Sequence, residues 1–336
     1  MTHPVDPAVE KAHTDVVNLF RKSTTRDPAG PAAVCRAARD RLAELPTLDP
    51  DDPSTWTSYE LVTADVRTLV GCLRETDVPS SEPEPFRSLV IRVLRYLRKA
   101  DRAEPGVLLA ESVHRDWVAR MGELHADTID AAGRLAACLL AQGDAKQARP
   151  VFERILRLRS SEYGDDHPDT LLAACNLGAC LNALEDFRAA SRLNTDTVQR
   201  CRRRLGKRDR TTILATGNLA GSLLRLGEAD QALSLYRYIH EWHRERSGEN
   251  SLVTLEAAAG IAVGLDGLGD HEAARAVNAD LLPRFERAAG KDYSGTKNTR
   301  SRLERNLRAL GRDEEADEVH GGIPKFLSPP RGTGSR

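Results

Sequence analysis

Arginine and asparagine side chains recur at one position of the chain every 42 residues (134 − 92 = 42). The row consists of Arg92, Arg134, Asn176, Asn218 and Arg302, with Gly260 between the last two. An asparagine amide both donates and accepts hydrogen bonds, which suits an extended peptide backbone, and a guanidinium offers paired donors that match a carboxylate. These residue types predict recognition of a peptide or protein segment. The alternative is that the same side chains are merely solvated and serve the architecture.

Other polar groupings predict less. His240 and His243 flank Glu241, but their i, i+3 spacing differs from the i, i+4 spacing of zinc-binding helices and no third ligand is evident, so we expect no metal site. A basic run covers 200–210, where positive charge complements the C-terminal end of a helix dipole. Contact with an anion or nucleic acid is the alternative for this run, which lacks the interleaved aromatic residues of single-strand binders.

No set of residues with a catalytic pattern is visible. The chain has no GxSxG elbow, no paired carboxylates that stand out from the charged surface, and no GxxxxGK[ST] phosphate loop. Cys138 and Cys180, one period apart, are interpreted as small buried residues at a close helix contact. We therefore expect no enzyme activity and no cofactor.

Composition restricts the class of protein further. The 336 residues carry 49 Lys+Arg and 50 Asp+Glu, with 40% hydrophobic and 4% aromatic residues. This composition is too apolar for a disordered chain, and its balanced charge gives no global attraction to nucleic acid or an anionic membrane. No run approaches 18 apolar residues, and the N-terminus lacks a signal-peptide pattern. Six cysteines without CxxC pairs agree with a reducing compartment, so we expect a cytoplasmic protein.

The period itself indicates the elements that carry the polar row. Four rows repeat in one register, formed by glycine, by threonine six residues later, by alanine, and by an apolar residue. The glycines are Gly122, Gly164, Gly206, Gly248 and Gly290, and the threonines are Thr128, Thr170, Thr212, Thr254 and Thr296. Self-similarity at such a period is typical of solenoids, in which each unit buries its apolar face only against its neighbours.

Each unit predicts an antiparallel helix pair. Apolar residues spaced by three and four, such as Leu171, Ala174 and Leu177, form a helical stripe. Glycine follows the first helix in four units, where it tolerates left-handed C-cap geometry. Glu185 stands at the same position in another unit and is the one exception. The expected organisation is an N-terminal arm over 1–31, partly helical, further helices over 32–80, a solenoid of about six pairs over 81–320 with degenerate outer pairs, and a flexible tail over 321–336.

These motifs resemble the tetratricopeptide repeat. The resemblance rests on the motifs NLG at 176–178, NLA at 218–220 and GDDHPDT at 164–170. The 42-residue period resembles the kinesin light chain type. TWTSYELV after LDPDDP, and LNTDTVQRCRRRLG, are similar to the tetratricopeptide regions of bacterial STAND proteins and of FxSxx-COOH system proteins. The resemblance implies an all-α fold, a right-handed α-solenoid of stacked antiparallel helix pairs. Because the phosphate loop is missing, it implies the sensor or scaffold part without the ATPase.

The resemblance also implies a place for the polar row. In such proteins the first helix of each pair lines the concave surface, and this repeat position points into it. Arg92, Arg134, Asn176, Asn218 and Arg302 would then form a peptide-binding ladder, as asparagine and basic residues do in carboxylate-clamp domains. A partner with a free C-terminal carboxylate follows by analogy with the FxSxx-COOH family.

The function expected from the sequence is a non-enzymatic adaptor or scaffold that binds a peptide or protein segment on its concave face. One alternative is a ligand-sensing regulatory protein that acts with a separate ATPase or transcription factor. Another is a non-catalytic subunit of a peptide-maturation enzyme complex. We expect no membrane partner and no nucleic acid.

Overall fold

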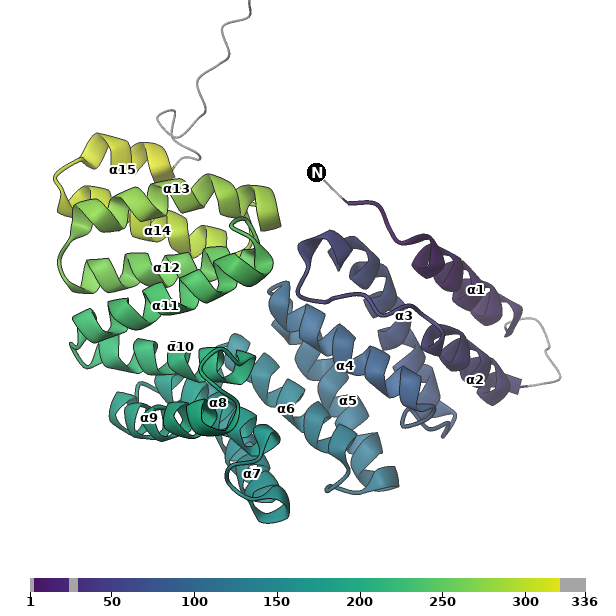
Figure 1. Ribbon diagram of the computed structural model, residues 1–336. Coiled ribbons are helices and arrows are strands. Elements are labelled where there is room, and N and C mark those ends of the chain that lie inside the picture. The colour runs from purple at the N-terminus through teal and green to yellow at the C-terminus, as the bar shows by residue number, and fades with distance from the viewer. Residues whose placement is uncertain (1–2, 24–29, 321–336) are drawn as a thin grey trace, which may run out of the picture. The chain divides into compact units, whose positions relative to one another are not determined.

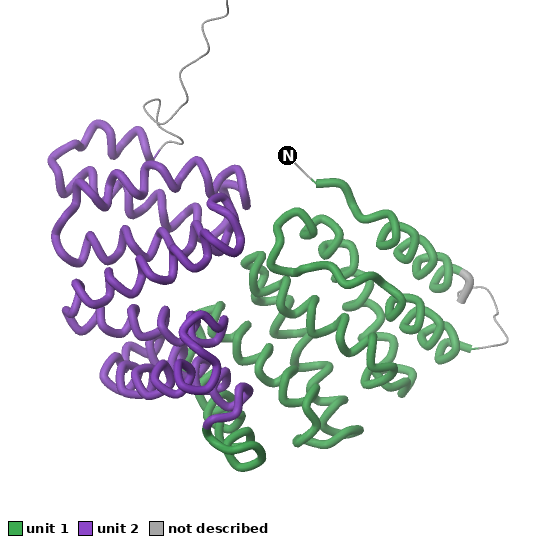
Figure 2. Tube along the Cα trace, viewed as in Figure 1, with its two compact units in different colours: residues 1–165 green, residues 166–336 purple. Residues whose placement is uncertain are grey.

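A computed structural model describes residues 3–23 and 30–320, and these residues form fifteen α-helices, one short 3₁₀ helix and no β-strand. The prediction of an all-α solenoid of antiparallel helix pairs is confirmed. The chain divides into two compact units, residues 1–165 and residues 166–336 (Figure 2). The predicted tail over 321–336 lies outside the described residues.

Unit 1 contains the helices α1 to α7, which are labelled in Figure 1. They are α1 (Pro7–Ser23), α2 (Gly30–Ala43), α3 (Trp56–Glu75), α4 (Glu84–Lys99), α5 (Ala103–Met121), α6 (Ala126–Ala141) and α7 (Ala145–Tyr163), with the 3₁₀ helix Pro53–Thr55 before α3. The helices α4 and α5, and then α6 and α7, are the first two repeating pairs. The three helices before them lie where the sequence predicts an N-terminal arm and N-terminal helices.

The N-terminal helices of unit 1 share one hydrophobic core with the first repeats. Buried residues from Val9 in α1 to Ala131 in α6 belong to a single cluster, which includes Phe86 and Trp117. The rings of Tyr59 in α3 and Tyr96 in α4 stack with centroids 5.1 Å apart. Since apolar burial is the main favourable term in folding, α1–α3 complete the core of the first helix pairs.

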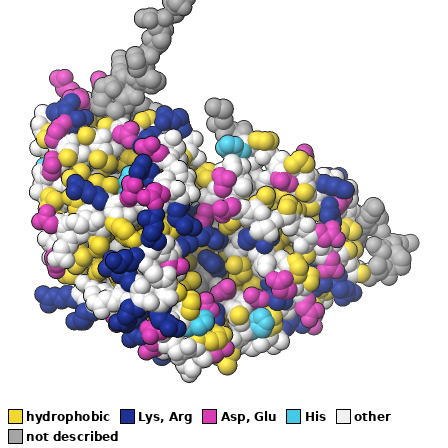
Figure 3. Space-filling model, viewed as in Figure 1, with side chains coloured by type: hydrophobic (Ala, Val, Ile, Leu, Met, Phe, Trp, Pro, Cys, Tyr) yellow, Lys and Arg dark blue, Asp and Glu magenta, His cyan; other side chains and the backbone are white. Residues whose placement is uncertain are grey.

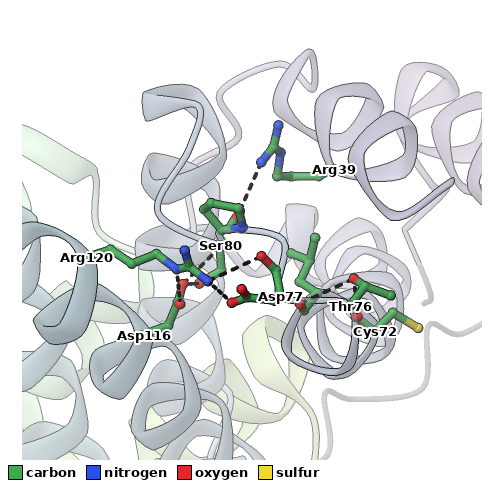
Figure 4. A network of polar contacts seen from close by, with 9 residues as sticks. Arg39, Cys72, Thr76, Asp77, Ser80, Asp116 and Arg120 are labelled. Carbon is green, nitrogen blue, oxygen red and sulfur yellow. Dashed lines mark hydrogen bonds and ion pairs between the residues drawn. The ribbon is translucent and has the colours of Figure 1, made fainter. Parts of the chain in front are cut away.

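Polar contacts hold the connection between α3 and α4 against α5 (Figure 4). One carboxylate oxygen of Asp116 accepts bonds from the Ser80 backbone N–H at 2.9 Å and from the Ser80 hydroxyl at 2.6 Å. The guanidinium of Arg120 donates to Asp116 and to Asp77. Arg39 of α2 donates to the carbonyl of Pro79 at 2.9 Å. One short connection is thereby tied to both α2 and α5.

Unit 2 continues the pairs in sequence order. Its helices are α8 (Pro168–Ala183), α9 (Phe187–Arg204), α10 (Arg210–Arg225), α11 (Ala229–Ser247), α12 (Leu252–Gly267), α13 (His271–Ala289), α14 (Ser294–Ala309) and α15 (Asp313–His320). Each helix packs against the next, and α8 also packs against α10 (Figure 1). The last pair is short because α15 has only 8 residues.

The glycine and threonine rows act together at the turns between pairs. Gly206 has a φ of 92°, in the region that favours glycine. Its carbonyl accepts a bond of 2.8 Å from the hydroxyl of Thr212. The same bond, also 2.8 Å long, joins Thr254 to Gly248 and Thr296 to Gly290. The six-residue interval in the sequence is therefore the span of one side-chain to backbone hydrogen bond.

The predicted division into four segments stays a prediction. The boundary between the two compact units at Asp165 falls inside the predicted solenoid, between α7 and α8. Among the described residues, no helix is long and apolar enough to cross a membrane.

Candidate functional site

The best-defined candidate surface of unit 2 is the face that α8 and α10 present side by side. On α8 the spacing i, i+4, i+7, i+11 places four residues on one side, and α10 repeats them one period later. We call this surface the α8–α10 face, and its residues are Leu172, Asn176, Ala179 and Ala183 with Leu214, Asn218, Gly221 and Arg225. The face changes in character along the helices, from leucine through asparagine and small residues to arginine.

The leucine end of the face is apolar and open. Leu172 is 41% exposed and Leu214 is 42% exposed, although most leucines of the first helices of the unit 2 pairs are buried. Two equivalent leucines on neighbouring helices offer a patch on which an apolar ligand side chain could rest.

The asparagines in the middle of the face differ in what they bind. The Asn218 amide donates to the carbonyl of Cys175 at 2.7 Å, so it joins α10 to α8. Asn182 donates to the carbonyl of Asn218 at 2.9 Å and strengthens the same contact. Within the described residues, the Asn176 amide makes no hydrogen bond to protein. Asn176 therefore retains its full donor and acceptor capacity for a ligand, whereas Asn218 also has a structural task.

A buried polar network lies beneath this face. The hydroxyl of Ser222 bonds to Oδ1 of Asn182 at 2.8 Å and accepts a bond of 3.1 Å from Asn194 of α9. Asn194 is 0% exposed, and its other atom, Oδ1, fills the space where a side chain at Gly178 would begin. The network fixes how α8, α9 and α10 meet, so the face above it is preorganised.

The arginine end of the face is a shallow pocket of about 380 Å³. It is lined by Asn182, Ala183, Glu185, Phe187, Gly221 and Arg225. The guanidinium carbon of Arg225 lies 4.8 Å from the centroid of the Phe187 ring, and one of its nitrogens lies 3.8 Å from the Glu185 carboxylate. The pocket thus holds a guanidinium whose orientation is set by an aromatic ring.

Arg302, the last residue of the predicted ladder, lies further along unit 2, on α14. It is half-buried, and burial, together with the neighbouring Arg305, lowers the pKa of its guanidinium. Between Asn218 and Arg302 the ladder position is Gly260, where a Cβ would lie 2.5 Å from Cδ1 of Tyr236. The ring of Tyr236 takes the place of a side chain there, so the row is interrupted.

The other two predicted residues, Arg92 and Arg134, belong to unit 1. The Nε atom of Arg92 is buried and has no hydrogen-bond partner in the described part of the chain. Burial lowers the pKa of Arg134, and of the neighbouring charges Asp130 raises it while Arg95 lowers it further. The structure brings Asn176 and Asn218 onto one face of unit 2 and places Arg92 and Arg134 in the other unit. The five-residue ladder therefore stays a prediction.

The remaining polar groupings have structural partners. In the basic run, Arg200 pairs with Asp196 and Asp166, and Arg208 pairs with Glu245. Cys138 and Cys180 are buried, and burial raises the pKa of the Cys138 thiol to about 11. The described residues contain no group of three or more His, Cys, Asp or Glu side chains that could hold a metal ion. Figure 3 shows Lys and Arg side chains interspersed with Asp and Glu over both units on the face drawn.

Sequence reasoning missed two parts of this site. The buried amides do not recur in each repeat. Asn278, Asn306 and Asp266 repeat the arrangement of Asn194, Ser222 and Asn182 two periods later. The pocket at Arg225 was also missed, although the exceptional Glu185 was visible in the sequence. A search for departures from the repeat would have found it.

Part of the repeat region matches a known family. Residues 127–203 match the family described as tetratricopeptide repeat. A search of curated proteins found no match. Among solved structures, the apo form of the quorum sensor NprR from B. thuringiensis has a TM-score of 0.56 and 15% identity, over 96% of this chain and 88% of that one.

Two further structures have lower scores. BtubC (BKLC) from P. vanneervenii has a TM-score of 0.49 and 15% identity, over 71% of this chain and 96% of that one. A signal transduction ATPase with numerous domains from Pyrococcus horikoshii, which has a tetratricopeptide repeat sensor, has a TM-score of 0.49 and 12% identity. That match covers 95% of this chain and 52% of the other.

Proposed function

Since residues 127–203 match the tetratricopeptide repeat family, we propose that the chain is a non-enzymatic adaptor or scaffold that binds an extended peptide or protein segment on the α8–α10 face. The observation that carries the proposal is the amide of Asn176, which has no hydrogen-bond partner among the described residues and lies beside Asn218 between an apolar patch and a guanidinium. An extended segment has backbone donors and acceptors for the amides and side chains for the two ends.

The geometry of the face favours binding over chemistry. Its polar groups are amides and one guanidinium, which hold a ligand but do not transfer protons near neutral pH. The buried network of Asn194, Ser222 and Asn182 holds the helices in place before the ligand arrives. A preorganised face loses little conformational entropy on binding, which supports a rigid recognition surface.

A second candidate is a ligand-sensing regulatory protein. The quorum sensor NprR shares the fold over 96% of this chain, which supports a sensor that acts with a separate ATPase or transcription factor. In that case binding at the α8–α10 face would change the activity of the partner, whereas a scaffold would only bring partners together. A subunit of a peptide-maturation complex and a ligand with a free C-terminal carboxylate are further proposals. We also propose a cytoplasmic location, because the six cysteines are free thiols.

The clean test is Asn176→Ala. Peptides selected from a random dodecapeptide display library on the full chain should bind the variant about tenfold more weakly, because one or two hydrogen bonds to the peptide backbone are lost. Fluorescence polarisation measures the affinity. Stability should not change, because the amide makes no bond to the described part of the protein.

Asn250→Ala is the matched control, since Asn250 is exposed in the turn between α11 and α12. It should bind the selected peptides like the parent chain. Equal affinity of the parent and Asn176→Ala would contradict the proposed site, and failure to recover any binding peptide would contradict the proposed function.

A further inference from the structure

Three residues of unit 2 depart from the repeat pattern, and all three meet in one pocket. Glu185 stands where the other pairs of the regular repeat have Gly143, Gly227, Gly269 and Gly311. Arg225 stands where the other regular pairs have Ala141, Ala183, Gly267 and Ala309, and the degenerate first pair has Lys99. Phe187 stands where its equivalents are Ala145, Ala229, His271 and Asp313. Because the repeats share one architecture, a residue that differs at an equivalent position serves either a local contact, as the buried Asn194 does, or a ligand site.

Glu185 keeps its position in spite of an unfavourable backbone conformation. Its φ is 61°, in the left-handed region that favours glycine. An L residue such as glutamate adopts this conformation at a cost of about 1 kcal/mol. The four equivalent turns of the regular repeat adopt it with glycine, and only the degenerate first pair has another residue there, Asp101. Strained backbone of this kind is concentrated at functional sites.

Arg225 is presented with its donors available. The guanidinium carbon lies over the Phe187 ring, 4.8 Å from its centroid. The Arg225 side chain is 58% exposed and lines the pocket. The Glu185 carboxylate lies 3.8 Å away, which is beyond hydrogen-bond length. Within the described residues the guanidinium therefore forms no hydrogen bond. Complementing the helix dipole at the end of α10 would explain an arginine, but it would require neither Phe187 nor the strained Glu185.

We propose that this pocket binds the carboxylate of an acidic side chain in the peptide segment, with Arg225 as the specificity-determining residue. The guanidinium edge matches a carboxylate through two parallel hydrogen bonds while its face stays on Phe187. Gly221 and Ala183 leave the floor of the pocket open for the incoming side chain. The inference rests on the proposed function, because the pocket is one end of the same α8–α10 face.

Glu185 acts as the competitor of the ligand carboxylate. Its loose ion pair partly neutralises Arg225 when the pocket has no ligand, and the incoming carboxylate must displace it. The pocket thereby discriminates against weakly bound acidic segments. Only a well-aligned carboxylate gains more binding free energy from Arg225 than is lost when the Glu185–Arg225 ion pair is broken.

The test uses the selected dodecapeptides and the full chain. A selected peptide should contain an acidic residue whose change from Asp to Asn, or from Glu to Gln, weakens binding about tenfold, as expected for a charge-assisted bond that is partly exposed. In Arg225→Ala the acidic and amide peptides should bind equally. Glu185→Gln should tighten binding of the acidic peptide about threefold. Arg237→Ala, an exposed arginine of α11, is the matched control and should change nothing.

The outcomes separate the two proposals. Peptides that depend on Asn176 but bind equally with Asp or Asn overturn the carboxylate pocket and leave the proposed function standing. If amidation of the peptide C-terminus abolishes binding while replacement of the acidic side chain does not, the bound carboxylate is the C-terminal one. That result overturns the proposal that it belongs to a side chain. Weaker binding by Glu185→Gln overturns its role as competitor. Recovery of no binding peptide overturns both proposals.

Discussion

At the scale of single residues, the close contact between Gly178 and Asn194 determines how α8 meets α9. Asn194 places its amide where a Cβ at position 178 would lie, and it is fully buried. The glycine that the sequence shows as part of an NLG motif is thus a packing requirement. It could not be predicted from the rows of the repeat alone, because Asn194 has its counterpart, Asn278, only two repeats later.

Gly178→Ala should lower the free energy of unfolding by about 2 kcal/mol, because the new methyl group forces the Asn194 amide out of place. In an Asn194→Ala background the same change should instead raise stability by about 0.5 kcal/mol, since alanine is the better helix former. Urea unfolding followed by circular dichroism measures both values.

Gly133→Ala in α6 provides the control for this pair of variants. A Cβ there would make an ordinary contact of 3.7 Å with Ile155, so the change should be neutral or stabilising. A loss at Gly178 that is equally large with and without Asn194 would contradict the proposed packing.

At the scale of elements, the sequence predicts the repeating helices well, but it predicts poorly the hydrogen bonds and ion pairs that hold the connections against them. Glycine after four of the first helices, and threonine six residues after each inter-pair glycine, are local signals that a single sequence carries. In the α3–α4 connection, shown in Figure 4, the Ser80 hydroxyl donates a hydrogen bond to Asp116. These two residues are far apart in the chain and do not recur with the period. Such a contact follows from tertiary packing, and only the structure shows it.

Asp116→Ala should destabilise unit 1 by about 2 kcal/mol, because a buried N–H and a hydroxyl lose their common acceptor. The groups affected are those of Ser80, and Arg120 also loses one of its two carboxylates. Thermal unfolding measures the loss.

Asp196→Ala is the matched control for Asp116→Ala. This exposed aspartate forms an i, i+4 pair with Arg200. Such a surface pair on a helix is worth only about 0.3 kcal/mol. A loss at Asp116 no larger than at Asp196 would show that the connection is held by apolar packing alone.

At the scale of the whole molecule, the period predicts the number of pairs but not the grouping of the core. The described residues between Glu84 and His320 form six helix pairs. The predicted site residues are nevertheless divided between two units, because Arg92 and Arg134 precede the boundary at Asp165 and the other three follow it. A periodic sequence treats all repeats alike, whereas α1–α3 enlarge the core of unit 1 only.

Unequal cores predict unequal responses to a local change. Val66 is fully buried in the core that α1–α6 share, and Val66→Ala should cost about 2 kcal/mol there. In a repeat protein, stability is a sum of local terms and nearest-neighbour terms, so the effect should weaken with distance along the chain. Trp117 reports on unit 1 and Trp242 on unit 2, and each can be isolated by replacing the other tryptophans with phenylalanine.

We expect Val66→Ala to lower the urea midpoint measured at Trp117 by more than the midpoint measured at Trp242. Each comparison is made within one tryptophan background, so the replacements themselves cancel. Equal shifts at both tryptophans would mean that the chain unfolds as one cooperative body, in contradiction to the nearest-neighbour expectation. Unequal shifts would imply that a ligand on the α8–α10 face stabilises unit 2 more than unit 1, since binding stabilises the part of the chain that must stay folded around it.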